Sequence, residues 1–115
     1  MKCAKVTEAG FQKTVLEMAK TFGWRVAHFR PGLTKSGKWR TAVAADGKGF
    51  PDLVLARPTV TNSPGRLIFA ELKVPPNDLT REQAHWIWLL ENVAKAEVYV
   101  WTPAQWDEIE RILGW

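Results

Sequence analysis

Two short stretches decide the fold of this chain: GFPDLVLA at residues 49–56 and LIFAELKV at residues 67–74. Both contain apolar, strand-forming runs, and residues 58–66 between them are rich in Pro, Thr, Asn, Ser and Gly. Two apolar runs joined by such a turn predict adjacent antiparallel strands. We expect these strands over residues 52–57 and 66–74.

Charged residues gather at one end of this predicted hairpin. Asp52 opens the first strand, whereas Glu71 and Lys73 lie two residues apart in the second. Because residues two apart in a strand point to the same face, the three side chains are expected to converge. Two carboxylates and an ammonium at one point indicate a metal site suited to phosphodiester cleavage.

Helices and further strands are expected on both sides of the hairpin. Thr7 caps a helix that Gly23 ends, and Thr80 opens a second helix with Gln83 placed for a capping box. The remaining elements are strands at 24–29, within 39–44 and at 97–102, and a final helix over 104–113. This order predicts an α/β fold with a mixed central sheet flanked by helices.

Composition limits the class of protein. The 115 residues fit one domain, 1–115, and 46% of them are hydrophobic, which is enough for a packed core. The single Cys excludes an internal disulfide and fits a reducing compartment. No apolar run is long enough for a membrane span and no signal-peptide pattern follows Met1, so we expect a cytoplasmic protein without a membrane partner.

The charge is divided unevenly along the chain. Residues 1–73 carry 13 Lys and Arg against 5 Asp and Glu, whereas residues 74–115 carry 3 against 7. A basic region just before Asp52 favours a polyanionic partner, and DNA is the partner we expect. Backbone phosphate contacts are expected from a set of basic residues, for which ordinary solubilising charge is the alternative: Arg30, Lys38, Arg40 and Lys48.

The acids predict a magnesium site, with manganese as a substitute. Asp52 and Glu71 would bind the metal, and the backbone carbonyl of Leu72 is a plausible further ligand. Glu8 falls on the apolar stripe of the first helix, where an ionised acid is unfavourable unless it is paired, so it could add a third carboxylate or simply turn to solvent. Lys73 would orient the attacking water or offset transition-state charge.

At these residues the chain resembles the PD-(D/E)XK nuclease superfamily, through Pro51–Asp52 followed by Glu71–Leu72–Lys73. Gly49, Glu8 and Gln83 narrow the resemblance to the stand-alone VRR-NUC domain of phages and bacteria. The resemblance implies a restriction-endonuclease-like αβ core, in which Asp52, Glu71 and Lys73 are catalytic, Glu8 assists the metal site and Gln83 lies beside it. It further implies a homodimer that cleaves branched DNA such as four-way junctions, in a bacterial or phage-infected cell.

Alternative interpretations remain for the site and for the chain. His28 could contact a phosphate or a water, or could be a structural residue, since the two His lack metal-ligand spacing. The same fold could serve as a non-catalytic nucleic-acid-binding module, or as a nuclease subunit that needs a partner. A domain for a small phosphorylated ligand is disfavoured, because no glycine-rich phosphate loop is present and no small-molecule cofactor is expected.

Overall fold

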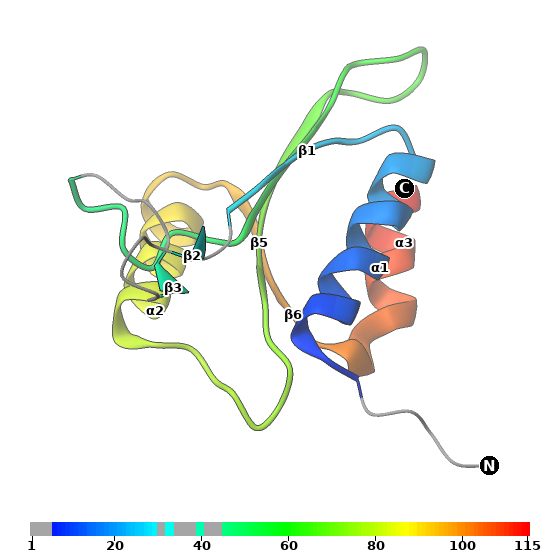
Figure 1. Ribbon diagram of the computed structural model, residues 1–115. Coiled ribbons are helices and arrows are strands. Elements are labelled where there is room, and N and C mark those ends of the chain that lie inside the picture. The colour runs from blue at the N-terminus through cyan, green and yellow to red at the C-terminus, as the bar shows by residue number, and fades with distance from the viewer. Residues whose placement is uncertain (1–5, 30–31, 34–38, 41–44) are drawn as a thin grey trace.

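The predicted hairpin forms the centre of a mixed sheet (Figure 1). The computed structural model describes residues 6–29, 32–33, 39–40 and 45–115. In this part of the chain four strands pair in the order β1-β4-β5-β6, with β1-β4 and β4-β5 antiparallel and β5-β6 parallel. Their bounds are β1 Arg25–His28, β4 Leu53–Arg57, β5 Arg66–Leu72 and β6 Glu97–Trp101. A separate two-stranded ribbon joins β2 (Gly32–Leu33) to β3 (Trp39–Arg40).

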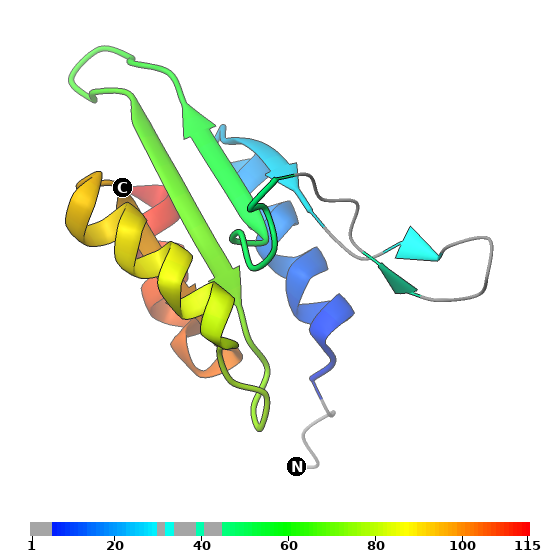
Figure 2. The same ribbon diagram turned by 90° about the vertical axis from the view of Figure 1, so that its left-hand side faces the viewer.

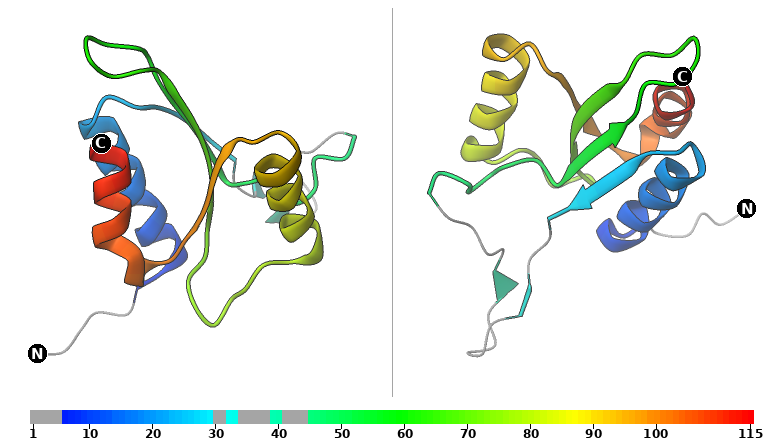
Figure 3. Two further views of the ribbon diagram at one scale, coloured as in Figure 1. Left: turned by 180° about the vertical axis from the view of Figure 1, so that it is seen from behind. Right: turned by 90° about the horizontal axis from the view of Figure 1, so that it is seen from above.

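Helices lie on both faces of the sheet. In chain order they are α1 Glu8–Thr21, α2 Arg81–Trp88, the π-helical turn η1 Leu89–Val93, the 3₁₀ turn η2 Pro103–Gln105 and α3 Trp106–Gly114. Figure 1 shows α1 and α3 side by side on one face, whereas α2 lies on the other, and the rear view in Figure 3 agrees. We call these the α1/α3 face and the α2 face.

Local sequence explains where the helices begin and end. The Thr7 side chain accepts a hydrogen bond from the Gly10 N–H, and Gly23 follows α1 at φ +83°, a conformation that glycine adopts without strain. Thr80 and Gln83 form the predicted capping box at the start of α2. The end of α2 differs from an ordinary C-cap, because the helix continues into η1.

The α1/α3 face carries the apolar core. Alternating strand residues point to it, so that Leu55 opposes Ile68 and Leu72 lies beside Trp101. The α1 stripe of Phe11, Val15 and Ala19 packs there with two residues of α3. Among the described residues, twelve buried hydrophobic side chains form one cluster: Phe11, Val15, Ala19, Trp24, Leu53, Leu55, Ile68, Ala70, Leu72, Trp101, Ile109 and Leu113.

Several predicted bounds were too long. The hairpin strands begin at Leu53 rather than Asp52 and end at Leu72 rather than Val74, because Asp52 and Lys73 lie just outside the ladder where the site forms. The strand expected within 39–44 is described only at Trp39–Arg40. In the part of the chain that the structure describes, no helix is long and apolar enough to cross a bilayer.

Candidate active site

Asp52 and Glu71 lie close together, because the start of β4 is paired with the end of β5. Asp52 directly precedes β4 and Glu71 is the penultimate residue of β5, so strand pairing brings them together across 18 intervening residues. The Leu72 N–H donates to Asp52 Oδ2 at 3.0 Å, and the Asp52 N–H donates to Glu71 Oε2 at 3.3 Å. Each acid is therefore held by the backbone of the neighbouring strand.

Gln83 holds the second oxygen of Glu71. Its Nε2 donates to Glu71 Oε1 at 2.9 Å, while its Oε1 accepts from the Thr80 N–H at 2.8 Å. The capping box that starts α2 thus also fixes the catalytic candidate on β5. These contacts place Gln83 directly beside Glu71.

The GFPD segment is locked against the start of α2. Gly49 has φ +84°, and a Cβ there would come within 2.6 Å of the Glu82 backbone, so only glycine fits this close approach. The next residue, Phe50, makes edge-to-face ring contacts with Phe29, Phe69 and Trp86, with centroids 5.1–5.9 Å apart. These contacts set the backbone that presents Asp52.

Lys73 and Glu8 reach the same place from different elements. Lys73 Nζ lies 4.0 Å from Glu71 Oε1, and its side chain is largely buried. A cavity of about 260 Å³ is lined by Glu8, Lys73, Val74, Asn77, Asp78 and Thr80. Figure 2 shows why: the end of β5, the first turn of α1 and the start of α2 lie at one edge of the molecule.

Burial makes the two carboxyls hard to ionise together. Glu71 is only 1% exposed, and desolvation, followed by repulsion from Asp52, raises its pKa from 4.5 to about 8. Attraction to Lys73 opposes this change. Desolvation also raises the pKa of Asp52, with a further contribution from the charge of Glu8, while the Leu72 N–H acts in the opposite direction. The pair therefore holds a proton near neutral pH in the absence of a cation.

The donor set fits a hard divalent cation of the magnesium type. Mg²⁺ commonly binds through one or two carboxylates and keeps several waters, and Asp52 and Glu71 supply that pair. The N–H and C=O of a strand residue point the same way, so the Leu72 carbonyl opens toward the side on which its N–H meets Asp52. Among the described residues, however, no three His, Cys, Asp or Glu side chains cluster as a metal-binding group.

Of the two alternatives given for Glu8, the structure shows the exposed position. It does not complete a three-carboxylate cluster, and it is exposed at the first turn of α1 rather than facing the core. Its position at the N-terminal end of the helix favours an acid, because the helix dipole is positive there. Glu8 nevertheless lines the same cavity as Lys73.

The residues predicted to contact DNA have varied positions. His28 pairs with Leu53, next to Asp52, but it lies on the α1 side of the sheet, whereas Glu71 faces α2. Lys48 makes an exposed ion pair with Glu82 at 3.5 Å. Arg30, Lys38 and the side chain of Arg40 lie outside the described residues.

Sequence reasoning missed the polar residues that follow β5. Asn77 and Asp78, in the PPND segment at residues 75–78, line the cavity with Lys73 but were not among the predicted site residues. The signal was present in the sequence, since this is the direct connection from Lys73 to the capping box at Thr80. A connection between two parts of one site is expected to border that site.

Comparisons with protein-family models, with curated proteins and with solved structures found no match to this chain. The functional argument therefore rests on the residues and geometry given above.

Proposed function

We propose that the protein is a metal-dependent phosphodiesterase acting on DNA, with its active site at Asp52, Glu71 and Lys73. One observation carries the proposal: two carboxyls and an ammonium converge at adjoining strand ends, with the carboxyls raised in pKa. Such perturbed groups are concentrated at functional sites.

The paired carboxyls favour a cation over a purely structural role. A structural acid pair would have to keep a proton or an unfavourable buried charge, because burial and mutual repulsion both oppose ionisation. A divalent cation removes that penalty, because both side chains can then bind it as ionised carboxylates. When bound, Mg²⁺ or Mn²⁺ would lower the pKa of a coordinated water and neutralise phosphate charge.

The chain's own residues have distinct roles in this proposal. Asp52 and Glu71 hold the cation, with the Leu72 carbonyl as a further oxygen donor. Gln83 is a positioning residue, since its amide fixes one Glu71 oxygen at 2.9 Å. Lys73, 4.0 Å from the same oxygen, orients the attacking water or offsets negative charge on the phosphate in the transition state. Glu8 acts across the cavity, through water.

The finer assignment is to the stand-alone VRR-NUC type of the PD-(D/E)XK superfamily. It is supported by the motif residues and by the order of elements, in which a helix and an antiparallel meander precede the crossover helix to a parallel strand. DNA as partner is supported by the basic first part of the chain. A homodimer on branched DNA would place two active sites about a two-fold axis.

The test is cleavage of labelled DNA in Mg²⁺ or Mn²⁺, with EDTA as a blank. A four-way junction, a fork, a matched duplex and a single strand are compared for the wild type, Asp52→Asn and Asp107→Asn. Asp107 is an exposed acid in the first turn of α3 and serves as the matched control. We expect Asp52→Asn to lower the rate on the order of a thousandfold, since metal stabilisation contributes several kcal/mol, and Asp107→Asn to match the wild type.

Each result has a definite meaning. Cleavage of the junction alone supports the branched-DNA assignment, whereas cleavage of every substrate keeps the phosphodiesterase and removes that selectivity. Salt-sensitive DNA binding without cleavage in either metal would replace the enzyme with a nucleic-acid-binding module. Equal cleavage by wild type and Asp52→Asn would contradict the assigned site.

A further inference from the structure

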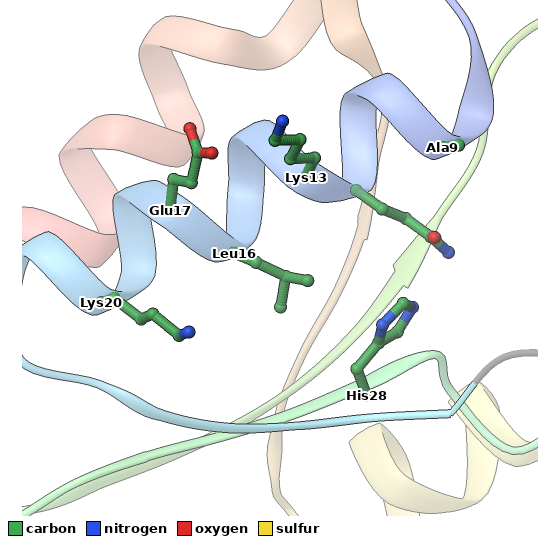
Figure 4. A pocket seen from close by; sticks show the side chains of 7 residues that line it. Ala9, Lys13, Leu16, Glu17, Lys20 and His28 are labelled. Carbon is green, nitrogen blue, oxygen red and sulfur yellow. The ribbon is translucent and has the colours of Figure 1, made fainter.

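A second, larger cavity lies between α1 and β1. It measures about 460 Å³, within the roughly 300–1,000 Å³ typical of ligand pockets. We call it the α1/β1 groove, and it is lined by Ala9, Gln12, Lys13, Leu16, Glu17, Lys20 and His28. Figure 4 shows Leu16 and Lys20 extending from the helix on the side of β1, and His28 pointing from β1 toward the helix.

The groove adjoins the proposed active site at two points. Ala9 lines the groove, while its neighbour Glu8 lines the cavity that contains Lys73. On the sheet, His28 pairs with Leu53, which directly follows Asp52. From Ala9 to Lys20 the helix rises about 16 Å, so the groove leads away from the site along the helix.

The chemistry of the lining suits a nucleic-acid strand. Lys20 offers an ammonium on the side of the helix that faces β1, whereas Lys13 and Glu17, which also line the groove, point to the other side of the helix. The floor is apolar at Leu16 and Ala9, and the His28 ring supplies a flat face on which a base can stack. An ammonium at the edge and an aromatic ring within form a combination that suits unpaired nucleotides.

We propose that the α1/β1 groove binds a short unpaired segment of the DNA strand, adjacent to the scissile phosphate. His28 stacks on a base and Lys20 contacts the backbone. The proposal rests on the proposed function, because it takes Asp52 and Glu71 as the point from which the strand enters. The groove has the volume of one small ligand, which admits one strand and excludes a duplex. Among branched substrates, those with an unpaired arm, such as forks and flaps, are therefore favoured.

Binding is measured by fluorescence anisotropy with fluorescein-labelled oligothymidine and a matched duplex, in Ca²⁺ to separate binding from cleavage. The variants are His28→Ala, His28→Phe, Lys20→Gln and, as a matched control, Lys95→Gln. Lys95 is exposed and precedes β6, at the end of the sheet away from Asp52. Thermal melting verifies that each variant is folded.

We expect His28→Ala to weaken oligothymidine binding about tenfold, His28→Phe to restore it, and duplex binding to change little in either. Lys20→Gln should weaken it severalfold and reduce the single-strand salt slope by about 0.7, the loss of one phosphate contact. Wild-type affinity in His28→Ala and Lys20→Gln would overturn the proposal. So would equal losses for single strand and duplex, or equal losses in Lys95→Gln.

The groove and the catalytic assignment fail in different ways. If cleavage is absent but the His28 and Lys20 variants selectively lose single-strand binding, the groove stands and the proposed hydrolysis does not. If Asp52→Asn abolishes cleavage while these variants bind and cleave forks as the wild type does, the nuclease stands and the groove does not.

Discussion

The two faces of the sheet differ in how completely their side chains are buried. On the α1/α3 face, Leu55, Ile68 and Leu72 are fully buried beneath two helices. On the α2 face, Leu67 is 49% exposed, and none of the residues of α2, all of which the structure describes, is buried. The α2 face nevertheless holds Glu71, a buried charged residue clamped by Gln83.

This difference separates stability from chemistry. Dense apolar packing on the α1/α3 face stabilises the sheet, and this stability offsets the unfavourable burial of the acid pair on the α2 face. Elements with few buried contacts open more readily, so α2 is expected to exchange its amide hydrogens faster than α1. The proposed site thus lies where the molecule is easiest to rearrange around a cation.

The difference in packing between the two faces is tested most directly by making the same Leu→Ala substitution on each. Leu55→Ala should lower the free energy of unfolding by about 3 kcal/mol, because it leaves a cavity in a fully packed layer. Leu67→Ala, on the opposite face, should lower it by less than about 1 kcal/mol. Urea unfolding with equal slopes measures both values, and similar losses would show that the α2 face is packed as tightly as its opposite.

A second prediction concerns pH, and its sign follows from Glu71. Its pKa is about 8 in the folded protein and near 4.5 when unfolded, so the folded state binds more protons between these values. Stability from this group is fully present below pH 4.5 and is lost as pH rises through 8, by on the order of 2–4 kcal/mol. The pKa of Asp52 is also raised, so this residue contributes to the loss of stability with rising pH in the same direction.

Glu71→Gln stays neutral and isolates this effect. Without divalent cation, we expect the wild-type melting temperature to fall between pH 5 and 8.5 relative to that of Glu71→Gln. Mg²⁺ should raise the wild-type value at pH 8 and leave the variant nearly unchanged, because metal binding stabilises only the form that binds it. Parallel pH curves for the two proteins would contradict the raised pKa.

The smallest expected difference in the free energy of unfolding is between substitutions at two glycines of positive φ, Gly23 after α1 and Gly49 beside α2. At Gly23 no described atom lies within 4 Å of an added Cβ, so Gly23→Ala should cost only the backbone strain, about 1 kcal/mol. Gly49→Ala adds a clash with the Glu82 backbone and should cost about 1–2 kcal/mol more. It should also reduce cleavage, since the segment before Asp52 must move, whereas Gly23→Ala should cleave as the wild type does.

Local signals in the sequence were sufficient for the three main helices, for the four strands of the central sheet and for the meeting of Asp52 with Glu71. Alternating apolar residues and a turn-rich connection define the hairpin, and Thr80 with Gln83 marks the start of α2. These features depend on residues close in sequence or on strand pairing, and both leave a periodic pattern.

Features that depend on three-dimensional packing were not visible in the pattern. Glu8 falls on the apolar stripe of α1 by helical period, and the pattern alone left open whether it joins the site or turns to solvent; it is exposed, because the buried stripe begins only at Phe11. The η1 turn after Trp88 and the docking of Gly49 on α2 also arise from contacts between distant segments. The α1/β1 groove belongs to this class, since Lys20 looks like an ordinary exposed helix residue until β1 is placed beside it.

The pairing of α1 with α3 has a consequence for synthesis on the ribosome. The Trp24 indole donates to the Leu113 carbonyl, 89 residues later, and Phe22 packs beside Gly114. At about 5–20 residues per second, roughly 5–20 s separate the translation of these partners. During that interval the apolar stripe of α1 lacks its cover, so the nascent chain is expected to be a chaperone client until α3 emerges.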